Sequence, residues 1–221
     1  MDRLRVLLVV KKNDEFSKKL ITFLKSKKIV LKYLFTNDKN NKLFKKKLES
    51  WSGDLLFSFR NRYIFKKKFL KNNIKIAAVN FHSGPPEYRG IGGINFAIFE
   101  KRKFFGVTAH LISEKIDTGK ILKVKRFKIK KDWDLKKTLD KTHKELFILS
   151  KKKIDFFYKK RKSAVKVLLS KTNEKWSKRL YTLKRLNKLY EINKDFSEKK
   201  IRLVIKSTNL DQFKPFIKLK N

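Results

Sequence analysis

The apolar run from Leu4 to Val10, interrupted only by Arg5, constrains the fold of this 221-residue chain more than any other feature. A strand that is apolar on both sides is buried on both faces, as in a parallel sheet that helices cover on both sides. Asp14 can cap a helix that follows the run. Further strands are predicted, after intervening helical stretches, at 29–35, 54–58 and 74–79. Strands that alternate with helices indicate a Rossmann-like α/β fold with a doubly wound, mostly parallel sheet and flanking helices.

The second half of the chain has a different pattern. A pair of strands around a turn is predicted at 104–112 and 121–129, and a long amphipathic helix is predicted from Asp134 onward. From Trp176 we expect a polar connection and then a strand at 201–205. The chain is therefore expected to form one main domain and a short appendage. The predicted boundaries are 1–160 for the domain and 161–221 for the helical and strand appendage.

The loop after the first strand argues against one common use of such a fold. Dinucleotide-binding proteins carry Gly-x-Gly-x-x-Gly at that point, because the backbone must approach the pyrophosphate closely. This chain has Lys11-Lys12-Asn13-Asp14 there instead. A dinucleotide-binding function is therefore disfavoured.

The formal net charge is +41, with 61 Lys and Arg against 20 Asp and Glu, which invites a nucleic-acid-binding hypothesis. The lysines fall in separated runs such as 45–47 and 66–68, which are typical of solvated helix faces, and A/T-rich codons can produce the same bias. The chain has no cysteine, which excludes disulfides, thiolate metal sites and cysteine nucleophiles. The apolar stretch at the start is too short for a signal peptide or a membrane span, so we expect a soluble, cytoplasmic protein.

Unusual residues gather after the fourth predicted strand. Six of the seven glycines lie between Gly84 and Gly119, and two of the three prolines and two of the three histidines lie in or beside that segment. In open α/β sheets the ligand crevice lies beyond the carboxyl ends of the strands, so a shaped loop at this point marks a candidate site. Asn80 and His82 are two residues apart on the strand and project to the same side, and Asp117 follows in a turn.

These three side chains have the chemistry of a catalytic site. An amide, an imidazole and a carboxylate in one crevice can polarise a carbonyl, stabilise an oxyanion and relay a proton. Asn-x-His is nevertheless a common sequence, and Asp-Thr-Gly is usually only a turn. The residues by themselves leave catalysis and a structural role equally open.

The wording of two motifs resembles the folate-dependent formyltransferase superfamily. The first motif is Asn80-Phe81-His82-Ser83-Gly84-Pro85-Pro86-Glu87-Tyr88-Arg89-Gly90, and it is similar to the active-site loop of that family. The second motif runs from Gly106-Val107-Thr108-Ala109-His110 to Asp117-Thr118-Gly119, and it is similar to the family's Gly-Val-Thr strand that leads into Asp-x-Gly. The resemblance covers residues 4–149.

The resemblance implies formyl transfer from 10-formyltetrahydrofolate to an amine, without a metal. It implies that Asn80 hydrogen-bonds the formyl oxygen, that His82 stabilises the oxyanion, and that Asp117 holds His82, helps to move the proton and raises the pKa of the imidazole. The implied pterin contacts lie in the loop after the third strand and are Arg62, Tyr63 and Ile64. The candidate acceptor contacts are Tyr88, Arg89 and His110, although Tyr88 and Arg89 can also pack the loop and His110 can be an interior histidine.

The acceptor is the least determined part of the prediction. Pro85 and Pro86 stand where many members have Leu-Pro, and the short tail from Trp176 resembles that of sugar N-formyltransferases more than the barrel domain of methionyl-tRNA formyltransferases. The expected partner is therefore a small-molecule amine, a nucleotide-linked amino sugar, with methionyl-tRNA as the alternative. A basic nucleic-acid-binding protein, an inactive formyltransferase-like protein and a homodimer also stay open.

Overall fold

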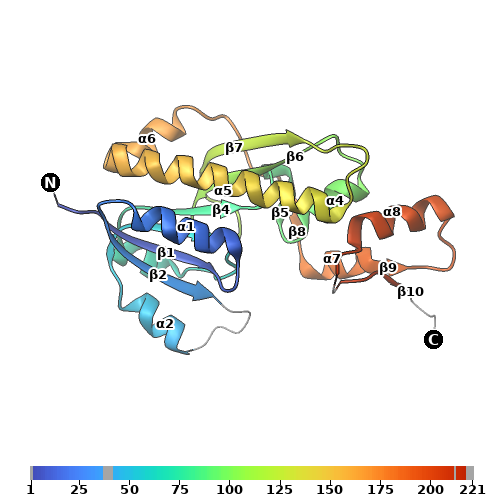
Figure 1. The fold of residues 1–221 in the computed structure, drawn as a ribbon, viewed down its shortest axis with the longest axis horizontal. Helices are drawn as coiled ribbons and strands as arrows, with labels where there is room; N and C mark the ends of the chain where they lie inside the picture. Colours follow the sequence, from blue (N-terminus) through green and yellow to red (C-terminus); the bar gives the residue numbers. More distant parts are fainter. Residues whose placement is uncertain (1, 37–41, 212, 218–221) are drawn as a thin grey trace.

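The computed structural model describes residues 2–36, 42–211 and 213–217, and its centre is a six-stranded sheet with helices on both faces (Figure 1). The strand order is β2-β1-β3-β4-β6-β7. The bounds of these strands are β1 Arg5–Lys11, β2 Val30–Thr36, β3 Gly53–Phe59, β4 Ile74–His82, β6 Phe104–Leu111 and β7 Ile121–Lys128. β1 to β4 pair in parallel, whereas β6 and β7 are antiparallel additions. The predicted fold class, a mostly parallel doubly wound sheet, is confirmed.

The helices follow the strands in the order that the sequence predicts for the first half of the chain. Their bounds are α1 Glu15–Lys25, α2 Lys42–Glu49, α3 Lys67–Asn73, α4 Gly93–Phe99, α5 Leu135–Lys160, α6 Ala164–Leu169, α7 Leu183–Tyr190 and α8 Glu198–Thr208. Four two-residue strands form separate small ladders, namely β5 Arg89–Gly90, β8 Leu180–Tyr181, β9 Glu191–Ile192 and β10 Phe216–Ile217. Asp14 caps α1 as expected, because its side chain accepts a hydrogen bond from the amide of Ser17 at 2.8 Å.

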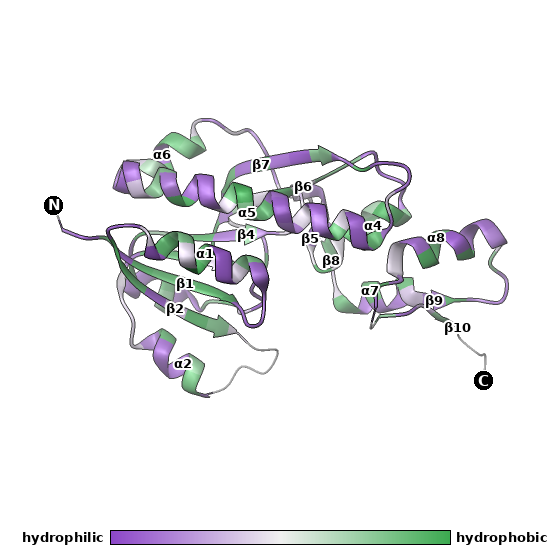
Figure 2. Cartoon of the chain, in the orientation of Figure 1, coloured by the Kyte–Doolittle hydropathy of each residue, from purple (hydrophilic) through white to green (hydrophobic). Residues whose placement is uncertain are grey.

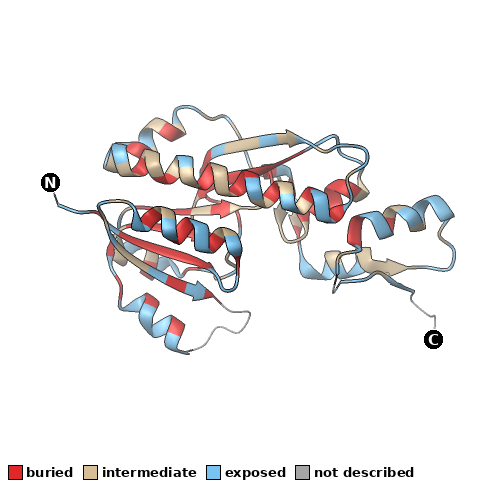
Figure 3. Ribbon diagram, in the orientation of Figure 1, coloured by how far each residue is buried: buried red, intermediate tan, exposed pale blue. Residues whose placement is uncertain are grey.

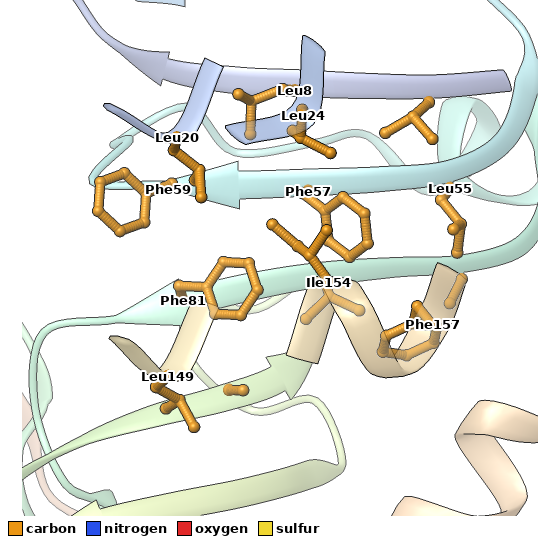
Figure 4. Packing of buried hydrophobic residues seen from close by; sticks show 14 of the residues in the cluster. Leu8, Leu20, Leu24, Leu55, Phe57, Phe59, Phe81, Leu149, Ile154 and Phe157 are labelled. Carbon is orange, nitrogen blue, oxygen red and sulfur yellow. The ribbon is translucent and has the colours of Figure 1, made fainter. Parts of the chain in front are cut away.

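The apolar run at the start of the chain is buried on both faces of the sheet. Val6, Leu8 and Val10 face one core, which α1 and α5 cover, and Leu7 and Val9 face a second core beneath α2 and α3. Figure 3 shows this burial along the central strands. The aromatic residues of the first core pack side by side (Figure 4) and include Phe57, Phe59, Phe81 and Phe157.

A third core joins the candidate loop to the appendage. It contains Tyr88 from the loop, several residues of α4, Phe105 of β6 and Tyr181 of β8. The side-chain amide of Asn95 in α4 donates to the backbone carbonyl of Ser207 in α8 at 2.8 Å, so α8 lies against α4 at one end of the molecule (Figure 1). The predicted boundary between the main domain and the appendage, at residue 160, coincides with the end of α5. Residues after this boundary nevertheless pack against the main domain.

The expected strand at 201–205 is wrong, because these residues belong to the helix α8. Ile201, Val204, Ile205 and Thr208 recur at intervals of three and four residues, which is the spacing of one helix face rather than of a strand. Val204 and Thr208 are buried. The short apolar run was ambiguous by itself, and the longer spacing decides it.

The longest helix is α5, with 26 residues, and it alternates hydrophilic and hydrophobic residues along its length (Figure 2). No helix in the described ranges combines the length and the apolar character that a bilayer-spanning helix requires.

The packing of α5 on the sheet gives a stability prediction. Phe157 is fully buried, and its ring lies edge-on to Phe57 with 5.9 Å between centroids. Phe157→Ala should lower the free energy of unfolding by about 3–5 kcal/mol, measured by urea denaturation, because it leaves a cavity in the core. Phe104→Ala is the control, since Phe104 is 58% exposed, and it should change this free energy by no more than about 0.5 kcal/mol. Similar losses in both variants would contradict the packing described here.

Candidate active site

The end of β4 brings two of the predicted residues to the carboxyl edge of the sheet. Asn80 and His82 lie two residues apart on β4, and β6 runs antiparallel beside it so that His110 pairs with Asn80. The Asn80 Nδ2 atom lies 3.0 Å from His110 Nε2. The His110 Nδ1 atom lies 2.8 Å from the carbonyl oxygen of Leu111.

Asp117 reaches the same place from the loop between β6 and β7. Its Oδ2 atom lies 3.3 Å from His82 Nδ1 and accepts a hydrogen bond from the Gly90 amide at 3.0 Å. Its Oδ1 atom lies 3.4 Å from His110 Nε2. The structure therefore groups His82 and His110 around the buried carboxylate of Asp117, which is 9% exposed, and Asn80 joins the group through His110.

Two glycines allow the loops to approach this closely. A Cβ atom on Gly119 would stand 1.7 Å from the carbonyl oxygen of Leu111, so the turn that follows Asp117 has no room for a side chain. Gly90 has φ of +103°, and a Cβ atom there would meet the Tyr181 carbonyl oxygen at 2.2 Å. Asp117 itself has φ of +47°, a conformation that is strained for most residues. The loop geometry explains why glycine is concentrated in this part of the sequence.

Both ring nitrogens of His82 face acceptors. Nδ1 faces Asp117, and Nε2 lies 3.1 Å from the carbonyl oxygen of Tyr88. Burial lowers the pKa of His82 below its ordinary value; Asp117 opposes this shift, and His110 adds to it. The expected effect of Asp117 on the imidazole is therefore present, but burial outweighs it and the net direction is the opposite of the prediction.

Asp117 stays ionised throughout the physiological pH range. Burial raises its pKa, but His82, His110 and the Gly90 amide together outweigh burial and lower the pKa to about 2. A folded-state pKa below the unfolded value stabilises the fold above the unfolded pKa. That contribution is lost as the pH falls from the ordinary aspartate pKa of 3.8 toward 2.

Tyr88 and Arg89, the other two predicted acceptor contacts, have different surroundings. The Tyr88 ring is 4% exposed and packs in the third core, with its hydroxyl donating to Glu100 Oε2 at 2.6 Å, so Tyr88 offers the site its backbone carbonyl. Arg89 donates through a terminal nitrogen to the carbonyl of Ser177 at 3.4 Å. Its Nε atom is buried and has no hydrogen-bond partner among the described residues.

The loop after β3 lies beside the end of β4, because Phe59 pairs with Phe81 across the two strands. Asn61 shapes this loop by accepting from the amide of Tyr63 at 2.8 Å. The Tyr63 ring packs against other aromatic rings of the second core. Arg62 is exposed and Ile64 is 56% exposed, so a cationic and an apolar side chain are both presented to solvent next to the site.

Sequence reasoning missed the role of Trp176 at this site. Its indole Nε1 donates to the carbonyl of Gly119 at 2.7 Å, and its ring lies edge-on to both site histidines. The signal in the sequence was an aromatic residue within a polar stretch. The sequence did not show where the folded chain places that residue. Within the described ranges, no three His, Cys, Asp or Glu side chains form a group suited to a metal ion.

The family model described as formyl transferase matches residues 4–149. Among curated proteins, the chain is 32% identical over 154 residues to the bifunctional polymyxin resistance protein ArnA of Wigglesworthia glossinidia brevipalpis, covering 66% of this chain and 23% of that protein. It is 32% identical over 105 residues to a methionyl-tRNA formyltransferase of Borrelia garinii, covering 46% of this chain and 33% of the relative. The chain thus matches a third or less of the length of these relatives.

Solved structures share the fold. A 4-N formyltransferase from Francisella tularensis superposes with a TM-score of 0.72 at 21% identity, covering 94% of this chain and 89% of that one. An N-formyltransferase from Helicobacter canadensis, in complex with folinic acid and dTDP-3-aminofucose, gives a TM-score of 0.64 at 18% identity and covers 92% of this chain and 80% of that one. Because the family model spans well over half of its residues, the chain belongs to the formyl transferase family.

Proposed function

We propose that this protein transfers a formyl group from 10-formyltetrahydrofolate to the primary amine of a nucleotide-linked amino sugar. The observation that carries the chemistry is the grouping of Asn80, His82, His110 and Asp117 at the carboxyl edge of the sheet, in a member of the formyl transferase family. Formyl transfer to an amine requires hydrogen-bond donors aimed at the formyl oxygen and a path for one proton, and these residue types supply both.

Asn80 and His82 are the proposed donors. The Asn80 amide nitrogen carries two protons, and its contact with His110 can use at most one of them, so a proton is available to an oxygen in the site. His82 Nε2 faces the Tyr88 carbonyl, and once the ring has taken up a proton this nitrogen can donate to a substrate oxygen that replaces that carbonyl. Donors fixed before the reaction stabilise developing negative charge without reorganisation.

Asp117 is the proposed partner of His82. Its Oδ2 atom lies 3.3 Å from His82 Nδ1, so it favours a proton on that nitrogen. Because burial lowers the pKa of His82, the ring is neutral near pH 7 with its proton on Nδ1. Nε2 can then accept a proton from the attacking amine and pass it to the departing folate nitrogen, with Asp117 stabilising the imidazolium in between.

The loop after β3 fits the folate. The folate supplies the formyl group when it is bound. Ile64 presents an apolar side chain that can pack against a flat ring, and Arg62 presents a cation that can meet a carboxylate. Tyr63 shapes the loop from beneath and contributes chiefly its backbone groups.

The proposed acceptor rests on Arg89, on the net charge and on the similar proteins. The buried Arg89 Nε has no hydrogen-bond partner in the part of the chain that the structure describes, and an unpaired buried donor is costly unless a ligand satisfies it, as a phosphate oxygen can. The net charge of +41 attracts a diphosphate. The similar Helicobacter canadensis protein binds a dTDP-linked amino sugar together with folinic acid. The alternative acceptor is methionyl-tRNA, which the name of the Borrelia garinii relative and the same positive charge favour.

A side-by-side assay tests the acceptor. Nucleotide-linked 3-amino and 4-amino sugars and charged initiator tRNA are each offered with 10-formyltetrahydrofolate, and release of tetrahydrofolate is followed spectroscopically. We expect turnover with an amino sugar, and we expect Arg89→Lys to raise the KM for that sugar without changing the KM for the folate. Formylation of the tRNA alone would overturn the sugar assignment, and no turnover with any acceptor, despite folate binding, would favour an inactive protein.

His82 gives a separate kinetic prediction. His82→Ala should lower kcat by about 10²–10³-fold, as expected when one donor to a developing oxyanion is removed, and should leave the Kd for folate nearly unchanged. His143→Gln is the matched control, because burial and the charge of Arg60 lower the pKa of His143 to about 3 and keep its ring neutral, as glutamine is. Equal losses of kcat and folate affinity in His82→Ala would instead identify a structural histidine.

A further inference from the structure

Residues 176–181 lie beyond the part of the chain that the family model matches, yet they follow the active-site loop closely. The amide of Ser177 donates to the carbonyl of Pro86 at 3.1 Å. β8 then pairs in parallel with β5, and the amide of Ile91 donates to the Tyr181 carbonyl at 2.8 Å. These backbone contacts place the 176–181 segment along the loop that joins His82 to α4.

Trp176, at the start of this segment, holds the turn that carries Asp117. Its indole N–H donates to the Gly119 carbonyl at 2.7 Å. A Cβ atom on Gly119 would meet the Leu111 carbonyl oxygen at 1.7 Å, so the turn packs directly against the β6 backbone. The turn is therefore held between the β6 backbone on one side and the indole N–H on another, and Asp117 is held with it at its positive φ.

The same indole restricts both site histidines. Its ring centroid lies 4.9 Å from that of His110, with an interplanar angle of 87°, and 5.8 Å from that of His82, with an angle of 72°. Both are edge-to-face arrangements, which are favourable for aromatic pairs. One side chain thus limits rotation of both imidazoles and covers them from water, since the side chains of His82 and His110 are only 11% and 3% exposed.

We propose that Trp176 is a positioning residue for formyl transfer, which orients His82, His110 and the Asp117 turn from a segment outside the matched family region. The inference rests on the proposed roles of His82 and Asp117. It makes the 176–181 segment part of the active site rather than part of the appendage. Trp176 acts through the two histidines and the turn, and no contact between it and the reacting atoms is required.

The kinetic test compares three variants in the full chain. Trp176→Phe keeps an aromatic ring and removes the N–H, Trp176→Leu removes both, and Trp133→Phe is the control, since the ring contact of Trp133 is with Lys130. We expect Trp176→Leu to lower kcat by about 10²-fold with little change in the Kd for folate, because small displacements of catalytic groups are this costly. Trp176→Phe should fall between Trp176→Leu and the wild type. The lower midpoint of the pH profile of kcat should rise in Trp176→Leu, because water then reaches His82.

A second readout does not depend on activity. The chain has three histidines, so the Cε1–H signals in the NMR spectrum can be assigned by replacing each in turn. Loss of the indole ring should move the signals of His82 and His110 and leave that of His143 in place, whereas Trp133→Phe should move none. If Trp176→Leu moves neither signal, or if kcat falls only as the fraction of folded protein falls and the pH midpoint stays fixed, the proposal is overturned. Displaced signals with no turnover in the wild type would instead count against the proposed acceptor.

Discussion

The carboxylate of Asp117 is the group around which the loops of this site are arranged. It is 9% exposed, and a charge that is removed from water requires polar partners to offset the desolvation. The partners come from separate parts of the chain, namely His82 at the end of β4, His110 in β6 and the backbone amide of Gly90. One buried charge therefore specifies how the β4 end, the loop after it and the β6–β7 turn sit relative to one another.

The sheet supplies the rigid frame for that arrangement. Parallel pairing of β3 with β4 sets the loop after β3 beside His82, and antiparallel pairing of β4 with β6 sets His110 opposite Asn80. The frame is stabilised by two apolar cores that cover opposite faces of the sheet. Hydrophobic burial thus fixes the backbone at the strand ends, and a small set of polar contacts then completes the site.

The parts that could be predicted from the sequence are those encoded by local patterns. The double-sided burial of β1 follows from its apolar run, and the grouping of Asn80 with His82 follows from their spacing on one strand. Trp176 could not be placed in the same way, because its contacts with Gly119 and the histidines depend on how the chain returns after α6. The helix α8 was mistaken for a strand because five apolar-rich residues fit both periods. The predicted direction of the His82 pKa shift was wrong, because the sequence shows the neighbouring charge but not the depth of burial.

The most direct test of this account is an NMR titration of the histidine Cε1–H signals in the wild type and in Asp117→Asn. Because burial outweighs the charge of Asp117, His82 should titrate below its ordinary value of 6.5 in the wild type. Loss of the Asp117 charge removes the interaction that opposes burial, so the midpoint of His82 should fall further in Asp117→Asn, while that of His143 stays at about 3. A His82 midpoint above 6.5 in the wild type, or one that does not change in Asp117→Asn, would contradict the buried pairing of these two residues.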